Sequence, residues 1–221
     1  MEQNTHWNGW KIVLASASPR RKELLEQIGI CPEVRPGAGD ENPAASTPEE
    51  MVKELSRCKA EEIGRGCSEG ELVIGADTVV AADGRILGKP HTVQRAKEMI
   101  SMLQGRSHEV YTGVTLMYMQ GDGTYRTRTF AEKTEVFVYP MTEEEICAYA
   151  ESGEPLDKAG AYGIQGRFAA YIREIRGDYT NVVGLPLGRL CHEIKHLGPA
   201  SRPEREDSQT NTNDHTGGKN D

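Results

Sequence analysis

The chain has 221 residues, of which 37% are hydrophobic and 27% are charged, and its formal net charge is −8. This composition is ordinary for a globular protein long enough to bury one sizeable core, and it excludes a fibrous or collagen-like protein. The acidic balance also argues against a general nucleic-acid binder, because such proteins usually present a broad basic surface.

Alternating strand and helix signals run along most of the chain, which indicates an α/β protein. In chain order the pattern predicts a strand at 11–15, helices at 19–28 and 47–63, a strand at 72–76, a hairpin turn at 83–84, a helix at 92–103, strands at 109–119 and 129–138, a helix at 141–154, a strand at 170–175 and a last helix from about 186. We expect one folded domain over 1–197, followed by a polar, disordered tail over 198–221 that has almost no apolar residues.

Signals for export, membrane insertion and metal-binding cysteines are lacking in this sequence. No apolar run approaches the roughly 20 residues of a membrane span, and "MEQNTHWNGW" at the start has neither the basic nor the apolar region of a secretory signal. The five cysteines are scattered and never spaced as CxxC, so neither a disulfide framework nor a zinc site is indicated. The sequence therefore predicts a cytoplasmic protein that does not bind membranes.

Two cations stand at a helix start, where acidic residues would be favoured. Ser18 and Pro19 make a good opening, with the serine hydroxyl as cap, yet Arg20 and Arg21 follow at once in the turn where the helix dipole is positive. A solvated helix face is the simple explanation. Alternatively, backbone N–H groups and two guanidinium groups together fit a multiply charged anion such as a polyphosphate.

Carboxylates and lysines that suit polyphosphate chemistry occur elsewhere in the chain. Asp77 ends the apolar strand in "VIGADT", where small neighbours leave room for a ligand, although turns and helix caps also use aspartate. Lys89 follows the hairpin, and we expect it beside Asp77. Glu41 in a loop and Lys59 on a helix face are weaker candidates, since both could be solvated charges. Neither GxxxxGK[ST] nor GxGxxG is present.

Six stretches, taken in order, resemble the Maf (septum formation inhibitor-like) family of nucleoside triphosphate pyrophosphatases. They are "LASASPRRKELL", "VIGADTVV", "GRILGKP", "GRSHEVYTGV", "EPLDKAGAYGIQG" and "VVGLPL", and the resemblance runs from about Lys11 to Leu197. It implies a Maf/ITPase-like α/β fold: a central curved mixed sheet flanked by helices, with two lobes around a substrate cleft. The resemblance is also compatible with a homodimer.

The resemblance implies hydrolysis of a nucleoside triphosphate between its α- and β-phosphates, with a divalent cation such as Mg²⁺, Mn²⁺ or Co²⁺. Carried onto matching positions, Asp77 is the catalytic residue and a metal ligand, and Glu41 is a second metal ligand. Whether Asp77 abstracts a proton or orients a metal-bound water stays open. The positions that the resemblance places along the phosphate cleft are Ser16, Arg20, Arg21, Lys59 and Lys89.

Gln165 in "AGAYGIQG", together with Arg20 and Thr78, resembles the branch of the family that acts on dTTP and UTP. A glutamine amide offers both a donor and an acceptor, as the O4 and N3–H edge of thymine or uracil requires, and modified pyrimidine triphosphates fit the same edge. The alternative is a loop glutamine bonded to backbone. The resemblance thus predicts pyrimidine specificity.

A non-catalytic anion- or nucleic-acid-binding regulator of cell division is the competing function. Asp77 argues against it, because a carboxylate in an anion site repels phosphate unless a metal bridges the two. We therefore favour an enzyme that has a nucleoside triphosphate as its partner and no stable nucleic-acid binding. His108 shows no metal-ligand spacing and is expected to position the sheet or a loop, and Tyr162 either stacks on a base or packs.

Overall fold

The computed structural model describes residues 6–37 and 43–197. The predicted disordered tail at 198–221 and the predicted metal ligand Glu41 lie outside these ranges. The described elements are β1 (His6–Trp7), β2 (Trp10–Leu14), α1 (Pro19–Gln27), β3 (Glu33–Val34), α2 (Pro48–Gly64), β4 (Glu71–Ala82), β5 (Arg85–Leu87), α3 (Val93–Leu103), β6 (Ser107–Met119), β7 (Tyr125–Val138), α4 (Glu143–Glu151), the 3-10 helices η1 (Glu154–Asp157), η2 (Ala159–Ala161) and η3 (Arg167–Tyr171), β8 (Ile172–Arg176), α5 (Tyr179–Val183) and α6 (Leu187–His196).

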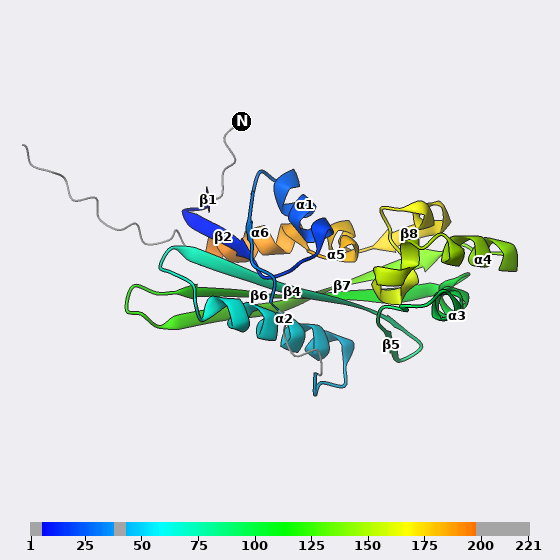
Figure 1. Ribbon diagram of the computed structural model, residues 1–221, viewed down its shortest axis with the longest axis horizontal. Coiled ribbons are helices and arrows are strands. Elements are labelled where there is room, and N and C mark those ends of the chain that lie inside the picture. Colours follow the sequence, from blue (N-terminus) through cyan, green and yellow to red (C-terminus); the bar gives the residue numbers. More distant parts are fainter. Residues whose placement is uncertain (1–5, 38–42, 198–221) are drawn as a thin grey trace, which may run out of the picture.

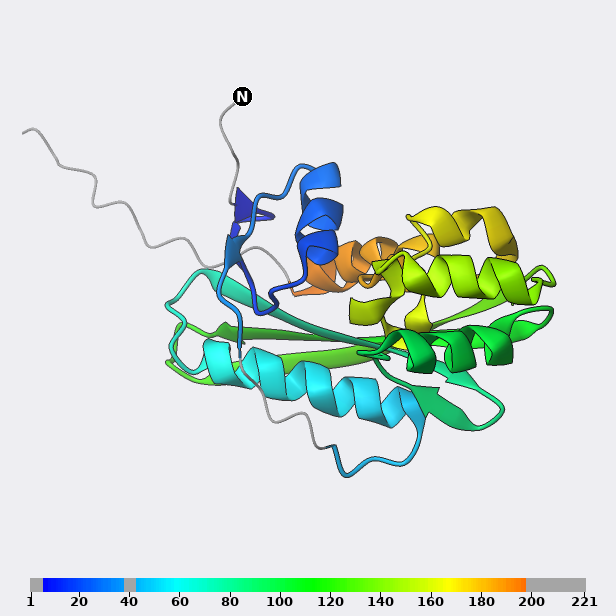
Figure 2. The same ribbon diagram turned by 45° about the vertical axis from the view of Figure 1, so that its right-hand side comes forward.

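One mixed sheet forms the centre of the molecule, with the strand order β1-β2-β4-β6-β7-β8, while β3 pairs with β2 and β5 with β4. The neighbours β2 and β4 are parallel, whereas β4, β6, β7 and β8 pair antiparallel in turn. Helix α2 covers one face, and α1, α5 and α6 lie over the other, while α3, α4 and the 3-10 helices gather at the far end of the long strands (Figures 1 and 2). The predicted α/β fold with a mixed sheet is confirmed.

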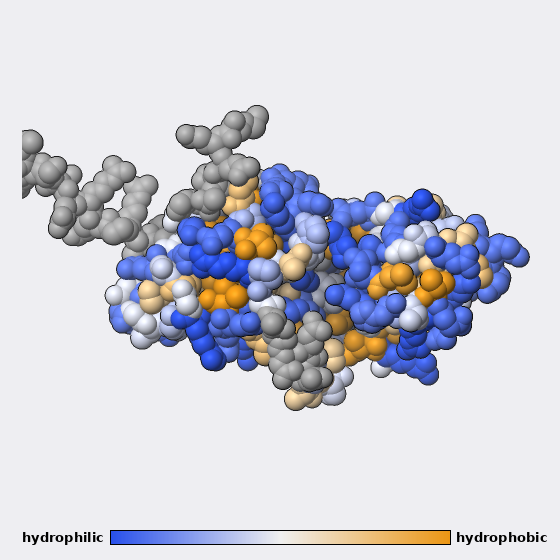
Figure 3. Space-filling view, viewed as in Figure 1, coloured by the Kyte–Doolittle hydropathy of each residue, from blue (hydrophilic) through white to orange (hydrophobic). Residues whose placement is uncertain are grey.

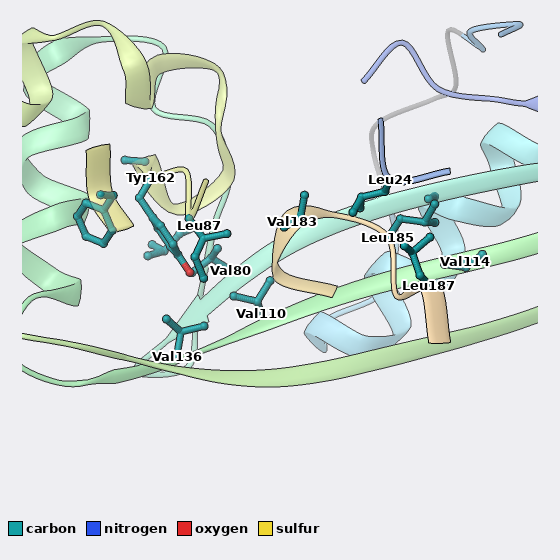
Figure 4. Close-up of a cluster of buried hydrophobic side chains, with 14 of the residues drawn as sticks. Leu24, Val80, Leu87, Val110, Val114, Val136, Tyr162, Val183, Leu185 and Leu187 are labelled. Atoms are coloured by element: carbon teal, nitrogen blue, oxygen red, sulfur yellow. The ribbon is translucent and has the colours of Figure 1, made fainter. Parts of the chain in front are cut away.

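Alternate residues of β2 and β4 belong to two separate cores, as the period of a strand requires. Val13 and Val73 pack with Ala60 of α2, whereas Leu14 and Ile74 face the larger core on the other side. Figure 4 shows this larger core running along the sheet, from Leu24, Leu185 and Leu187 at one end to Tyr162 and Leu87 at the other. The sheet is therefore buried on both faces near its middle.

Local chemistry explains why several elements begin and end where they do. The hydroxyls of Thr47, Thr92 and Thr142 accept the backbone N–H of the third residue after them, so each threonine caps its helix. Asp83 and Gly84 both have positive φ, at 49° and 70°, which is the tight hairpin turn predicted between β4 and β5.

The prediction for the strand at 72–76 is wrong in its length. Strand β4 has 12 residues and continues through Asp77, which pairs with Gly113 of β6. Aspartate is depleted in strands, which is why the pattern indicated an end there. Tertiary partners for the polar side chains allow the strand to continue. The short helix α5 was also not predicted from the sequence.

On the face shown in Figure 3 the surface is mostly hydrophilic, and the hydrophobic residues form small separate areas. Isolated areas of this kind are normal on soluble proteins and do not by themselves indicate a docking surface. Among the described residues, no helix combines the length and apolar character that crossing a membrane would require.

Candidate active site

The candidate site lies at one edge of β4, at a stretch of this edge with which no described strand pairs. We call this the uncovered stretch of β4. Strand β2 pairs with β4 only as far as Ile74, and β5 pairs with it from Val80 to Ala82, while β6 occupies the other edge throughout. Both β2 and β5 run toward the stretch between them. Asp77 and Thr78 lie in this stretch, so the residues that follow β2 and β5 approach them from two sides.

Asp77 forms an ion pair with Lys59, whose Nζ lies 2.5 Å from the Oδ1 atom of Asp77. The two side chains are only 17% and 16% exposed, so the pair is partly shielded from water. Residue alternation places Asp77 on the α2 face of the sheet, together with Val73 and Gly75. The sequence analysis expected Lys89 beside this carboxylate, whereas the structure places Lys59 there.

Glycines in the sheet allow α2 to come close enough for this pair to form. A Cβ atom on Gly75 would lie 2.3 Å from the carbonyl oxygen of Ser56, and one on Gly113 would lie 2.1 Å from that of Val52. The backbone of α2 therefore fills the space beside Gly75. The expectation that small residues next to Asp77 leave room for a ligand is wrong on this face of the strand, because the helix occupies that room.

Arg21 is buried and connects three elements on the opposite face. Its Nε donates to the carbonyl oxygen of Gly184 at 2.8 Å, Nη1 donates to the Oγ of Ser16 at 2.9 Å, and Nη2 donates to the Oγ1 of Thr78 at 3.1 Å. Burial lowers the pKa of Arg21, and the charge of Asp77 opposes this shift. A guanidinium has five N–H donors, so these partners among the described residues leave two of them unused.

The side chain of Ser18 does not cap α1, so that prediction is wrong. Its backbone N–H instead donates to the Oγ of Ser16 at 3.3 Å, the same oxygen that accepts from Arg21. Ser16 is 8% exposed. The two serines thus shape the turn from β2 into α1 and set the position of Arg21.

Thr78, predicted to contribute to specificity, has its hydroxyl in a buried chain of hydrogen bonds. The Oγ1 atoms of Thr78 and Thr112 are 2.9 Å apart, and Thr112 donates to the carbonyl oxygen of Asn181 at 3.0 Å. Thr112 and Asn181 were not singled out from the sequence. Only the long-range hydrogen bonds from Thr78 to Thr112 and from Thr112 to Asn181 reveal this support.

Arg20 and Lys89 differ from Arg21 in being accessible. The Nη1 of Arg20 is 3.8 Å from the Oδ2 of Asp157 in η1, and a third of its side chain is exposed. Lys89 is exposed and lies two residues after β5. The antiparallel register, with Val80 opposite Leu87, would place Lys89 level with Thr78 if it continued, and its closeness to Asp77 stays a prediction.

Gln165 is exposed in the turn between η2 and η3. The preceding part of this segment contacts the chain next to Lys89, because the N–H of Gly160 donates to the carbonyl oxygen of Gly88 at 3.1 Å. The Arg20–Asp157 pair joins the start of α1 to the same region. These contacts bring Arg20, Lys89 and the segment carrying Gln165 to one side of the uncovered stretch of β4.

His108 and Tyr162, which lies three residues before Gln165, form a buried pair. The Nε2 of His108 lies 2.8 Å from the hydroxyl of Tyr162, and the rings meet edge to face with centroids 5.2 Å apart. Burial lowers the pKa of His108 to about 4. The prediction that His108 positions a loop is consistent with this contact, and packing explains Tyr162 without base stacking, since it is 6% exposed.

The described residues contain no group of three or more His, Cys, Asp or Glu side chains arranged to hold a metal ion. A divalent cation bound with a triphosphate needs only one or two protein carboxylates, because phosphate oxygens and waters supply the other ligands. Of the two predicted metal ligands, the described ranges contain Asp77. Its carboxylate, with Lys59 bound to Oδ1, fits this limited donor set through its other oxygen.

Comparison with known proteins agrees with these features. The profile of the family described as Maf-like protein matches residues 11–197. A protein of Agathobacter rectalis described as dTTP/UTP pyrophosphatase is 52% identical over 200 residues, which cover 85% of this chain and 98% of that protein. A protein of Lachnoclostridium phytofermentans with the same description is 49% identical over 189 residues, which cover 86% of this chain and 96% of that protein.

Among solved structures, a HAM1 protein from Coxiella burnetii has a TM-score of 0.43 at 15% identity and covers 84% of this chain and 98% of that chain, a level of similarity that adds nothing to the assignment. The family profile spans nearly all of the described residues, and the two relatives are similar along almost their whole lengths. The chain therefore belongs to the Maf-like protein family.

Proposed function

We propose that this protein hydrolyses dTTP and UTP to the nucleoside monophosphate and pyrophosphate. The observation that carries the proposal is the Lys59–Asp77 pair at the uncovered edge of β4, with Arg21 bonded to the neighbouring Thr78. A site with one oriented carboxylate among several cations suits a polyanion that reacts with water. The description of relatives that are about half identical supports this activity and this pair of substrates.

The reaction forms one bond and breaks one bond at the α-phosphorus. A water oxygen attacks that phosphorus in line, the bond to the bridging oxygen breaks, and pyrophosphate leaves with the electron pair. Asp77 orients the attacking water and accepts a hydrogen bond or proton from it, while Lys59 fixes the carboxylate in place. Asp77 would be the described residue that helps to hold a divalent cation, which would supply Lewis-acid stabilisation of negative charge.

The cations act on the charge that builds up in the transition state. Arg20 and Lys89 are accessible, so they can contact phosphate oxygens directly, and Arg21 retains two donors for the same purpose. Arginine forks onto two oxygens, while lysine acts as a point charge. Gln165 recognises the O4 and N3–H edge of the pyrimidine. The cytoplasmic location, the Glu41 ligand and the homodimer stay predictions.

Pyrophosphate release from dTTP, UTP, CTP, ATP, GTP and 7-methyl-GTP tests the proposal, with and without a chelator. We expect release from dTTP and UTP that stops with the chelator and returns with Mg²⁺, Mn²⁺ or Co²⁺. Asp77→Asn should lower kcat by at least roughly 100-fold, since a positioned acid or base contributes about that much.

Asp83→Asn is the matched control for this variant. Asp83 also pairs with a cation, its Oδ2 lying 2.6 Å from Nη1 of Arg106, but it sits in the exposed hairpin turn, so its loss should leave kcat within about twofold. Equal turnover of 7-methyl-GTP and dTTP would refute the pyrimidine preference. Release from no triphosphate, combined with salt-sensitive binding that survives Asp77→Asn, would favour the anion-binding regulator instead.

A further inference from the structure

One carboxylate, that of Glu154 in η1, contacts the segment around Gln165 in two ways. Its Oε2 accepts the backbone N–H of Arg167 at 3.0 Å, and its Oε1 accepts the hydroxyl of Tyr149 at 3.0 Å. That hydroxyl in turn accepts the backbone N–H of Gly163 at 3.3 Å. Glu154 is therefore linked to both ends of the five-residue segment whose middle residue is Gln165.

Tyr149 is a rigid support for this link. It lies on α4, is 4% exposed, and its ring packs against Phe168 with centroids 5.1 Å apart. Burial raises the pKa of Tyr149, so its hydroxyl remains a donor to Glu154 throughout the physiological range. A hydrogen bond from a neutral donor to a carboxylate is stronger than one between neutral groups.

Close packing requires glycine on the segment itself. A Cβ atom on Gly166 would lie 2.1 Å from Oε1 of Glu154, although its φ of −98° is open to any residue. A Cβ atom on Gly163 would lie 2.8 Å from Cε of Lys158, whose Nζ donates to the carbonyl oxygen of Glu154 at 2.6 Å. The lack of a Cβ atom at these glycines lets the side chains of Glu154 and Lys158 lie close to the backbone of the segment.

We propose that Glu154 is a positioning residue that fixes the segment Gly163–Arg167 and thereby holds Gln165 in place to select the pyrimidine base. The proposal rests on the proposed function for the role of Gln165, but the arrangement of Glu154, Tyr149 and the two N–H groups does not depend on it. Within the described part of the chain, Glu154 forms no hydrogen bond with Lys59 or Asp77. It should therefore affect base selection and leave the chemical step unchanged.

UTP and CTP make the sharpest pair of substrates, because they share the triphosphate and ribose and differ only at the base edge. We expect Glu154→Ala to lower the ratio of kcat/KM for UTP to that for CTP roughly tenfold, about the effect of one misplaced hydrogen bond. The loss should appear in KM for UTP, while kcat stays within about twofold. Glu154→Gln keeps an acceptor for the N–H of Arg167 and should restore part of the ratio.

A double-mutant cycle with Gly166→Ala tests the contact itself. The new Cβ would displace the Glu154 carboxylate, so this single change should resemble Glu154→Ala. In the Glu154→Ala background the same Cβ meets no carboxylate, so the double variant should be no worse than either single variant. Glu151→Ala is the control, since Glu151 is exposed and pairs with Lys97 at 2.8 Å, away from this segment. Additive losses would overturn the proposal.

Gln165→Ala, measured in parallel, separates failure of this inference from failure of the proposed function. If Gln165→Ala lowers the UTP to CTP ratio and Glu154→Ala does not, the positioning role is wrong. An equal loss for both substrates would also overturn it, because that indicates a merely structural role.

Hydrogen exchange provides a readout that needs no substrate. Glu154→Ala should speed exchange of the Arg167 amide at least tenfold relative to Glu151→Ala, because that N–H donates directly to the carboxylate. Exchange of the Gly163 amide should also rise, because its N–H donates to the Tyr149 hydroxyl that the carboxylate holds. Unchanged exchange at both amides would overturn the inference, even if the enzyme proved to act on other triphosphates.

Discussion

The residues around Asp77 and the segment around Gln165 are held by two different kinds of contact. Asp77, Thr78 and Arg21 depend on partners far along the chain, such as Gly184, which is 163 residues from Arg21. The segment around Gln165 is held by Glu154, which is 13 residues or fewer from every backbone group it fixes. The part proposed to face phosphate is therefore built by the whole fold, and the part proposed to face the base is a local unit.

This difference predicts that the two regions can be damaged separately. A change that disturbs the fold around Asp77 should lower turnover of all triphosphates alike, because every substrate presents the same phosphates. A change confined to the segment around Gln165 should alter the choice between bases. Substitutions at Gly75, Arg21 and His108 sharpen this comparison, in decreasing order of expected effect.

Gly75→Ala is expected to have the largest effect on stability. Its Cβ would lie 2.3 Å from a backbone oxygen of α2, so the helix must move and carry Lys59 away from Asp77. We expect the free energy of unfolding to fall by roughly 4 kcal/mol, with UTP and CTP turnover reduced equally. Urea unfolding and steady-state kinetics measure the two effects.

Gly188→Ala is the control for this change, since nothing lies within 4 Å of a Cβ at this exposed position of α6. Removing a glycine from a helix should raise the free energy of unfolding by roughly 0.5–1 kcal/mol. If Gly75→Ala is as well tolerated, the close seating of α2 does not determine the position of Lys59.

Arg21→Ala and Arg20→Ala should separate structure from substrate binding at adjacent positions. Arg21→Ala removes three hydrogen bonds, two of them buried and one partly buried, and should lower the free energy of unfolding by about 3 kcal/mol, counting about 1 kcal/mol for each. Arg20→Ala removes one exposed ion pair at 3.8 Å and should change stability by less than about 0.5 kcal/mol.

The accessible arginine, Arg20, should affect substrate binding without affecting stability. Arg20→Ala should raise KM for dTTP roughly tenfold in a protein of normal stability, because it removes an accessible charge that we propose contacts phosphate. An unchanged KM would remove Arg20 from the binding site. Equal losses of stability in the two variants would contradict the contrast between a buried and an accessible arginine.

The His108–Tyr162 pair predicts a pH dependence of stability. The pKa of His108 falls from 6.5 to about 4 on folding, so between these pH values the unfolded chain binds a proton that the folded chain does not. The free energy of unfolding is therefore undiminished above pH 6.5 and decreases as the pH falls toward 4. Between pH 7 and pH 5 we expect a loss of about 2 kcal/mol from this group.

His108→Asn should remove this contribution, so the variant's unfolding free energy should change less over the same pH interval, whatever its stability at pH 7. Urea titrations of both proteins at pH 7, 6 and 5 measure the difference. Parallel pH profiles would show that His108 is not the group responsible. Carboxylates with lowered pKa values, such as Glu33 and Glu71 at about 2, act mainly below this window, between their ordinary value of 4.5 and about 2.

Most residues of the candidate site could be named from the sequence, but the burial and the partners of each side chain could not. The pair Arg20–Arg21 is conspicuous in the sequence, yet nothing in it distinguishes the buried arginine from the accessible one. Gly184 and Thr78, which hold Arg21, are remote along the chain and carry no motif that points to an arginine. Thr112 and Asn181 were missed for the same reason, and Glu154 was not distinguished from other surface acids.

The sequence by itself determined the features that depend on neighbouring residues. Thr47, Thr92 and Thr142 cap helices, and Asp83–Gly84 turns a hairpin, because these conformations are set within three or four residues. Tertiary structure alone decided that β4 continues through Asp77, that α2 fills the space beside Gly75, and that Lys59 reaches the carboxylate. A polar residue in a strand becomes favourable only when a distant partner satisfies it, and such partners are assigned by packing.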